Sequence, residues 1–363
     1  MSTKTITARC HCRAVHFTLT LPTSSLPLSA HLCHCTLCRT THGTPASFHA
    51  PLPKGIKPSF IAPSSWENLT SYLPPGSKEP LYFCSTCGCH VGVLNPTGVW
   101  GMSISILVDG NEGGKIWVVD EHIYTEKGST GDGGIAEVVK SVGGQELRVW
   151  NPEDTTGGTG FNPRGSNSNT NTSDDGDDAL LAECNCGGVS FKISRPRQDF
   201  LNSPRSKGWI HPSDETKWLA LFDVCDDCRL LTGAHVSTWL FVRTDHISPP
   251  LPPNLLIGNT MKRYESTPGE VSRTFCGTCG ATVFCWVKKR QGIVDIATGI
   301  LRAKEGVMLE KWAVWRTAKL GFLEDGVAYD KEFAEGFDEG MKQWGRRVTG
   351  AVTDFGGDGP EAD

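Results

Sequence analysis

The feature that most constrains the fold is a set of cysteine pairs that occurs twice, in the same order, along the chain. A C-x-C pair opens each copy at Cys10–Cys12 and at Cys184–Cys186, and a C-x-x-C-G turn follows at Cys84–Cys87 and at Cys276–Cys279. Apolar residues alternate after each C-x-C pair, as in a strand with one buried face: Val15, Phe17 and Leu19, then Val189, Phe191 and Ile193. Matched blocks in a fixed order indicate a tandem repeat.

The length and composition agree with two copies of a strand-rich domain. A chain of 363 residues is long enough for about two domains of ordinary size. Its 41 glycines and 22 prolines favour short strands and turns over long helices. We therefore predict two strand-rich domains, each large enough to bury a core of its own.

Two segments contain too few apolar residues to fold by themselves. Residues 151–180 lie between the copies and hold a Gly-rich stretch, an Asn/Ser/Thr tract and an acidic run at 174–178. Burial of apolar surface cannot offset the entropy of ordering such a segment, so we predict a flexible polar linker. It separates a first domain, residues 5–150, from a second, residues 181–345, and we expect residues 346–363 to form a disordered acidic tail.

One segment near the C-terminus has helical rather than strand periodicity. From Asp330 onward, apolar side chains recur at the three- and four-residue spacing of a helix: Phe333, Phe337, Met341 and Trp344. We predict a short C-terminal helix that docks this apolar face onto the rest of the protein.

Fifteen cysteines in a chain that starts without an export signal favour metal binding over disulfides. The first residues lack the apolar core, about 7–15 residues long, of a signal peptide, and closely spaced thiols in a reducing compartment more often bind metal than pair. Residues 1–66 contain no Asp or Glu, as in transit peptides, but cleavage there would remove Cys10 and Cys12. No apolar run approaches the ~18 residues of a membrane span. We expect a cytoplasmic protein.

Each copy offers four cysteines that could close the coordination shell of one metal ion. The short C-x-C and C-x-x-C spacings let both sulfurs of a pair reach the same ion, and thiolates select zinc or iron over hard cations. Zinc is the first choice because it needs no redox machinery, and buried reduced thiols are the alternative. The two quartets are Cys10, Cys12, Cys84 and Cys87, then Cys184, Cys186, Cys276 and Cys279.

A third group of thiols, Cys33, Cys35 and Cys38, is one ligand short of a closed zinc shell. Structural zinc sites use four protein ligands, whereas catalytic sites use three and keep one position for water or substrate. A carboxylate can also ligate zinc, so the matching group of the second copy predicts an oxygen-containing variant, a weak site or an empty one. That group consists of Asp223, Cys225 and Cys228.

An arginine follows the last thiol of each central group, Arg39 in the first copy and Arg229 in the second. A guanidinium can bind the carboxylate of a substrate through two parallel hydrogen bonds, and a structural ion pair is the alternative role. His34 lies between two candidate ligands, so we expect its side chain to point away from the metal.

The combined pattern resembles the family of glutathione-dependent formaldehyde-activating enzymes and centromere protein V: C-x-C, then V-x-F, then C-H-C-x-x-C-R and C-x-x-C-G. The resemblance covers both copies and implies an all-β, tent-like zinc fold in each. It also implies a structural zinc on each quartet and a catalytic zinc on the group Cys33, Cys35 and Cys38, hence three to four zinc ions per chain. Asp223 departs from the pattern, which suggests that the second copy serves as a scaffold or shapes the substrate site.

The resemblance implies a carbon–sulfur lyase reaction, the condensation of formaldehyde with glutathione to S-(hydroxymethyl)glutathione, with a glutathione-like thiol as the partner. The alternative is a non-catalytic zinc-binding interaction module of the centromere protein V type. The net charge of −5 and the acidic end of the chain give no broad attraction to nucleic acid or anionic lipid. Neither nucleic acid nor a membrane is therefore an expected partner, and no oligomeric state is inferred.

Overall fold

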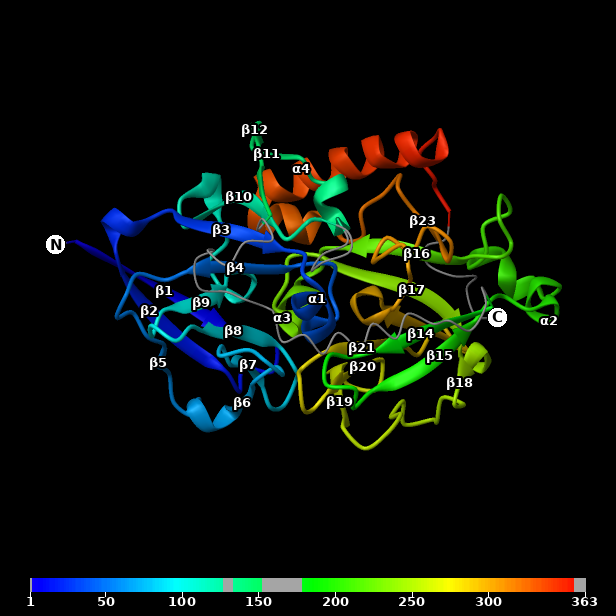
Figure 1. Cartoon of the computed structure of the whole chain (residues 1–363), viewed down its shortest axis with the longest axis horizontal. Coiled ribbons are helices and arrows are strands. Elements are labelled where there is room, and N and C mark those ends of the chain that lie inside the picture. Colours follow the sequence, from blue (N-terminus) through cyan, green and yellow to red (C-terminus); the bar gives the residue numbers. More distant parts are fainter. Residues whose placement is uncertain (1, 127–132, 152–177, 356–363) are drawn as a thin grey trace.

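The computed structural model describes residues 2–126, 133–151 and 178–355 (Figure 1). Most of the predicted linker, residues 152–177, and the end of the predicted tail, residues 356–363, lie outside the described residues. The described chain consists mainly of short strands in several sheets, which confirms the all-β prediction.

The first copy contains a three-stranded and an eight-stranded sheet, with the hairpin β11-β12 beside them. The small sheet has the order β1-β2-β5, and the large sheet has the order β13-β10-β3-β4-β9-β8-β7-β6. The strands are β1 Thr3–Arg9, β2 His16–Pro22, β3 Leu28–Cys33, β4 Ser47–Pro51, β5 Ser59–Phe60, β6 Leu69–Tyr72, β7 Leu81–Cys84, β8 His90–Leu94, β9 Trp100–Ser103, β10 Trp117–Ile123, β11 Ser141–Val142, β12 Gln145–Glu146 and β13 Arg148–Trp150.

The second copy repeats this topology. Its small sheet has the order β14-β15-β18, and its large sheet, β19-β20-β21-β22-β17-β16-β23, matches β6-β7-β8-β9-β4-β3-β10 strand for strand. The strands are β14 Ala179–Glu183, β15 Ser190–Ser194, β16 Trp218–Asp223, β17 Ser237–Arg243, β18 Ile247–Ser248, β19 Met261–Thr267, β20 Val271–Cys276, β21 Thr282–Val287, β22 Ile293–Ala297 and β23 Ala313–Trp315. The common strand order confirms the tandem repeat, and β13 is an additional edge strand of the first copy.

Each copy has a seven-residue helix that begins within its central group, α1 Thr36–His42 in the first and α3 Asp226–Thr232 in the second. Cys35 and Cys225 are the N-caps of these helices, and their sulfurs accept hydrogen bonds from the backbone N–H groups of Cys38 and Cys228. The strand therefore delivers the first member of each group, and the first helical turn delivers the other two. The further helix α2, Gln198–Leu201, is a single turn.

The two copies pack against each other through α1 and α3, which lie at their junction (Figure 1). The backbone N–H of His11 donates to Leu230 O of α3 at 3.0 Å, and the equivalent N–H of Asn185 donates to Thr40 O of α1 at 3.1 Å. Because each copy gives the other the same contact, the junction resembles the two-fold interface of a homodimer. One continuous hydrophobic core runs through both copies.

Gly43 and Gly233, which follow α1 and α3, permit this close packing. A Cβ atom at Gly43 would collide with the carbonyl oxygen of Thr282 in the second copy. A Cβ atom at Gly233 would collide in the same way with the carbonyl oxygen of His90 in the first copy. The predicted domains are therefore two halves of one packed body.

The C-terminal helix α4, Leu323–Thr349, is longer than predicted and has a break at Asp330, whose φ is −145°. Asp330 caps the second stretch, because its Oδ1 accepts a hydrogen bond from Phe333 N at 3.3 Å. The predicted apolar face is buried as expected and spans the junction of the copies (Figure 1). Phe333 contacts Phe48 of the first copy, and Phe337 contacts Phe222 of the second.

The start of the predicted disordered tail is ordered. Residues 346–349 continue α4, and Arg347 forms an ion pair of 2.9 Å with Glu137 of the first copy. Basic residues in the last turn also favour the helix, because they interact with its carbonyl end. Beyond the helix, Thr353 O accepts a hydrogen bond from Thr317 N at 2.9 Å. The tail boundary at residue 346 is therefore too early.

Candidate metal centres

The structure brings together the first quartet, Cys10, Cys12, Cys84 and Cys87. The turn after β1 carries the first two thiols, whereas Cys84 ends β7 and Cys87 lies in the turn that follows. Cys10 Sγ and Cys12 Sγ are 3.4 Å apart, and Cys12 Sγ and Cys84 Sγ are 3.6 Å apart. Hydrogen bonds from Cys10, then Cys12 and Cys87, lower the pKa of Cys84, so the group already favours one thiolate.

The second quartet, Cys184, Cys186, Cys276 and Cys279, has the same arrangement. Its Sγ separations are 3.6 Å between Cys184 and Cys186 and 3.5 Å between Cys186 and Cys276. Tetrahedral zinc with Zn–S bonds of about 2.3 Å separates its sulfurs by about 3.8 Å. The donor type, number and spacing of both quartets therefore fit closed zinc sites.

The central group of the first copy, Cys33, Cys35 and Cys38, also comes together and is buried. Cys33 ends β3, and its Sγ lies 3.4 Å from Cys35 Sγ. Hydrogen bonds from Cys33, Cys35 and Ser47 lower the pKa of Cys38 well below its usual range, although burial opposes them. Among the described residues, the group of possible ligands has three members rather than four, so these residues fit a zinc ion with one open position.

Two residues beside this group were not found from the sequence. Tyr124 belongs to the same buried cluster as the three cysteines, and its φ of 59° is uncommon for an aromatic residue. Glu79 is only 6% exposed, and burial followed by the charge of Cys38 raises its pKa to about 7. The sequence contains no signal for the Tyr124 backbone conformation, and the position of Glu79 depends on strand pairing.

Buried histidines lie on the other sides of the same group. His34 points to His122, with His34 Nε2 and His122 Nδ1 2.8 Å apart, and it is not among the possible ligands. His42 Nδ1 lies 2.9 Å from Cys38 O, and its ring stacks on that of His90. Burial lowers the pKa of His49 to about 4. These rings are therefore neutral near pH 7.

In the second copy, Asp223, Cys225 and Cys228 also approach one another. Asp223 Oδ1 accepts a hydrogen bond from Cys225 N at 2.8 Å, and Asp223 Oδ2 lies 3.3 Å from Cys228 Sγ. Cys225 Sγ and Cys228 Sγ are only 2.7 Å apart. This separation is about 1 Å shorter than two zinc-bound sulfurs require, so the group fits a zinc ion less well than the other three.

Arg273 lies beside this second group and was also not found from the sequence. Burial alone would lower its pKa, but the negative charges of Cys228, Cys285, Cys225 and Asp223 raise it well above its usual range. The repeat contained a signal for this residue, because Arg273 in β20 occupies the position of the buried Leu81 in β7.

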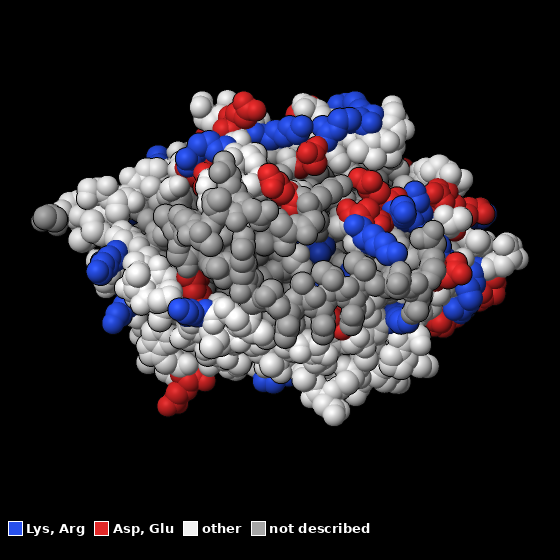
Figure 2. All heavy atoms as spheres, in the orientation of Figure 1, with Lys and Arg blue, Asp and Glu red and all other residues white. Residues whose placement is uncertain are grey.

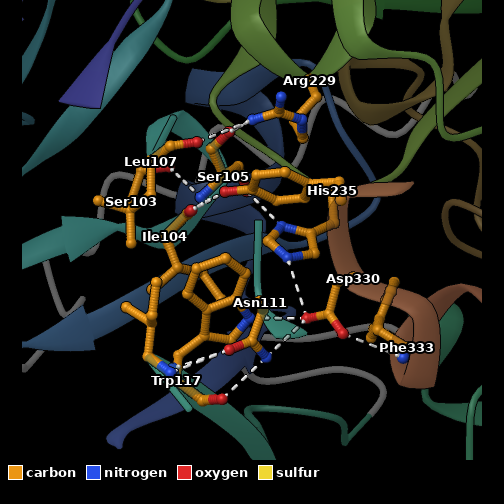
Figure 3. Close-up of polar contacts among 12 residues, drawn as sticks. Ser103, Ile104, Ser105, Leu107, Asn111, Trp117, Arg229, His235, Asp330 and Phe333 are labelled. Atoms are coloured by element: carbon orange, nitrogen blue, oxygen red, sulfur yellow. Dashed lines mark hydrogen bonds and ion pairs between the residues drawn. The ribbon is translucent and has the colours of Figure 1, made fainter. Parts of the chain in front are cut away.

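The two arginines predicted to bind a substrate carboxylate are both buried. Arg229 Nη2 donates to Asp226 Oδ1 at 2.7 Å. Its Nη1 donates to the Ser105 carbonyl oxygen of the first copy (Figure 3). Its guanidinium also stacks on Tyr329, 3.5 Å from the ring centroid. These contacts match the alternative structural role. Arg39 has the equivalent place in the middle of α1, a helix that contacts the segment Thr298–Ile300 of the second copy.

A buried polar network joins both copies to α4 (Figure 3). Asp330 Oδ2 accepts hydrogen bonds from Trp117 Nε1 at 2.7 Å and Asn111 Nδ2 at 3.3 Å. His235 Nδ1 lies 2.6 Å from Ser105 Oγ, and its Nε2 lies 3.8 Å from Asp330 Oδ2. A cavity of about 10 Å³ at this network has room for one water molecule at most. The network therefore secures the junction rather than binding a ligand.

A protein-family model described as "Glutathione-dependent formaldehyde-activating enzyme" matches residues 5–126 and 213–317, which make up more than half of the chain. The second match begins after Cys184 and Cys186, which the structure joins to Cys276 and Cys279. No curated protein and no solved structure matches the chain. None of the helices in the described part of the chain is long and apolar enough to span a membrane.

Proposed function

The chain belongs to the family of glutathione-dependent formaldehyde-activating enzymes, and from this premise we propose that it is a carbon–sulfur lyase acting at the central group of the first copy. The proposed substrates are glutathione and formaldehyde, and the product is S-(hydroxymethyl)glutathione. The observation that carries the proposal is the contrast between the closed quartets and the three-membered group of Cys33, Cys35 and Cys38. An open ligand position is what a substrate thiol requires.

The reaction joins the sulfur of the thiol to the carbonyl carbon and moves the thiol proton to the carbonyl oxygen. Cys33, Cys35 and Cys38 would hold the zinc ion, which supplies a Lewis acid that favours the ionised form of a bound thiol. Glu79 is suited to the proton transfer, because a group with a pKa near 7 can both accept and return a proton at neutral pH. In this role its carboxylate takes the thiol proton and then donates it to the new hydroxyl group.

Tyr124 is proposed to position the reactants. It forms one buried cluster with the three cysteines, against which Leu37 and Ile123 pack, and it is only 3% exposed. An apolar cover of this kind keeps water away from the sulfur and strengthens electrostatic interactions beneath it. Its uncommon backbone conformation is held by the hydrogen bond from Tyr124 N to Trp150 O at 3.0 Å, which places the ring over the group.

Charge distribution favours a small-molecule substrate over a polyanion. On the face in Figure 2, the described Lys and Arg side chains are interleaved with Asp and Glu and do not gather into a basic surface. A nucleic-acid site depends on such a surface. Nucleic-acid binding therefore finds no support among the described residues of this face, and a glutathione-like thiol remains the proposed partner.

The proposal is tested by following exchange between free and adduct-bound formaldehyde by NMR in the presence of glutathione. The zinc-loaded protein should accelerate exchange, and Cys35→Ser should abolish the acceleration. Cys225→Ser, at the equivalent position of the second copy, is the matched control and should leave the rate unchanged. Equal exchange rates with and without the wild-type protein would refute the enzymatic function.

A further inference from the structure

The central group of the second copy differs from the other three groups in the distance between its sulfur atoms. Cys225 Sγ and Cys228 Sγ are 2.7 Å apart, whereas the sulfurs of the C-x-C pair in each of the other groups are 3.4 to 3.6 Å apart. Two ligands of one tetrahedral zinc need about 3.8 Å, and a disulfide bond measures about 2.05 Å. The pair is therefore too close to share a zinc ion and close enough for its sulfurs to bond after a small movement.

Asp223 occupies the position of a thiol ligand but is placed to accept protons. Its Oδ1 accepts a hydrogen bond from Cys225 N, and its Oδ2 lies 3.3 Å from Cys228 Sγ, within reach of the Cys228 thiol proton. At 7% exposure the carboxylate is shielded from solvent. A buried carboxylate in this position can take the proton that Cys228 must lose before its sulfur reacts.

Arg273 is the second, independent feature of this group. It is only 8% exposed, and its Nε and Nη1 atoms have no hydrogen-bond partner among the described residues. A fixed positive charge repels a divalent cation and stabilises a nearby thiolate. The first copy has Leu81 at the equivalent position, so this charge distinguishes the second group from the first.

From these contacts we infer that Cys225 and Cys228 form a redox-active dithiol that exchanges electrons with low-molecular-weight disulfides, instead of a fourth zinc site. The C-x-x-C spacing is one in which two thiols readily form a reversible disulfide. Cys225 is the attacking residue, because it is 7% exposed, whereas Cys228 is 1% exposed. The inference concerns the second copy and does not depend on the adduct chemistry proposed for the first.

The exchange with oxidised glutathione takes place in two steps. Cys228 passes its proton to Asp223 and takes up the proton of Cys225, along the contacts of 3.3 and 2.7 Å. The sulfur of Cys225 then attacks one sulfur of the disulfide, and the first glutathione leaves and takes up the proton held by Asp223. Cys228 then passes its proton to Asp223 and attacks Cys225 Sγ, and the second glutathione leaves and recovers that proton. The protein loses two electrons and two protons, and the glutathione disulfide gains both.

The test uses the zinc-loaded full chain at a series of ratios of oxidised to reduced glutathione. Free thiols are alkylated, the Cys225–Cys228 peptide is weighed by mass spectrometry, and zinc is counted before and after. We expect three zinc ions per chain throughout and a peptide that becomes lighter by two hydrogen atoms and reverts with reduced glutathione. Four zinc ions per chain, or a pair that stays reduced at every ratio, would overturn the inference. This test needs only the wild-type protein, so it does not depend on the folding of any variant.

Three variants separate the roles of the residues, with folding checked by circular dichroism. Cys228→Ser should trap Cys225 as a mixed disulfide with glutathione, and an unmodified Cys225 would contradict its attacking role. Asp223→Asn should slow disulfide formation about 10-fold or more, because it removes the proton acceptor. Asp223→Cys restores the ligand set of the first copy and should raise the zinc count to four while protecting the pair from oxidation. If Cys225 and Cys228 of the Asp223→Cys variant still formed a disulfide, the identity of the third ligand would not explain the difference between the copies.

Discussion

Neutral histidines lie around the central group of the first copy, whereas charged side chains lie around that of the second. His42 stacks on His90 with ring centroids 3.8 Å apart, and burial lowers the pKa of both rings. The second copy buries Arg273 instead, together with Asp295, whose Oδ2 forms an ion pair of 2.6 Å with Nη2 of the half-buried Arg290. Two centres built on one strand order therefore provide different electrostatic surroundings.

The differences lie at matched positions of the repeat. Thr232 and Thr282 occupy the places of His42 and His90, at the end of the helix and at the start of the strand. The backbone contacts at the junction are nevertheless the same in both directions. The comparison teaches that the strand order and the junction depend on backbone contacts, which tolerate many side chains, whereas the chemistry of each centre depends on a few side chains within that frame.

The largest effect is expected from giving the first copy the ligand set of the second. Cys33→Asp should lower adduct exchange by at least about 100-fold, because Lewis-acid stabilisation is worth several kcal/mol. It should also reduce the zinc count by one per chain. NMR exchange and elemental analysis measure the two effects, with Cys225→Ser as the control. A variant that keeps both rate and zinc would show that one carboxylate does not account for the difference between the copies.

The junction should respond equally to changes in either copy. Gly43→Ala and Gly233→Ala place a methyl group against a carbonyl oxygen of the other copy, and each should lower the free energy of unfolding by about 3 kcal/mol or more. Gly55→Ala is the control, because Gly55 also has a positive φ but no atom lies within 4 Å of its Cβ position. Its cost should be about 1 kcal/mol. Urea unfolding measures all three, and tolerance at only one junction glycine would contradict the two-fold arrangement.

The repeat, the four groups of possible ligands and the apolar face of α4 could be predicted because their signals are local in the sequence. The spacing of Cys84 and Cys87 is readable without any tertiary information, and so is the periodicity of Phe333 and Phe337. The helix begins at Leu323, before the predicted start at Asp330. Asp330 interrupts the helical backbone and caps the turn that follows, so the sequence around it is that of a helix start. A cap inside a longer helix has the same sequence signal as a cap at its start.

The junction and the surroundings of the centres could not be predicted, because they depend on residues that are far apart in the sequence. The contact between His11 N and Leu230 O exists only after both copies have folded. A glycine after a helix, such as Gly43, is typical of any helix C-terminus, so its presence does not indicate that it also packs against the other copy. Of these residues, only Arg273 could have been identified from the sequence, because the repeat aligns it with the apolar Leu81.

A smaller effect on the rate is expected at Glu79, whose place in the second copy is taken by Val271. Glu79→Gln removes the proton acceptor and should lower adduct exchange by about 10- to 100-fold. The wild-type rate should rise with pH through about 7, where half of the carboxylate is formed, and level off at higher pH, because the pKa of Glu79 is raised to about 7. The variant should lack this rise after subtraction of the protein-free rate. An unchanged pH profile would exclude Glu79 from the proton transfer.

The smallest effect is a gain in stability from the same substitution. Burial, then the charge of Cys38, raises the pKa of Glu79 from 4.5 to about 7 in the folded protein. Below about pH 4.5 the carboxyl is neutral in both the folded and the unfolded chain. Between about pH 4.5 and 7 stability falls as pH rises, because the carboxyl ionises in the unfolded chain while burial keeps it protonated in the folded one. Glu79→Gln avoids this loss. The free energy of unfolding of the variant should therefore exceed that of the wild type by on the order of 2 kcal/mol at pH 8 and by much less at pH 5.

Urea unfolding at both pH values measures the difference. Zinc release at acidic pH affects both proteins alike, and the exposed Glu67→Gln serves as the control. An equal difference at the two pH values would show that the buried carboxylate of the first copy does not ionise as the comparison of the centres requires.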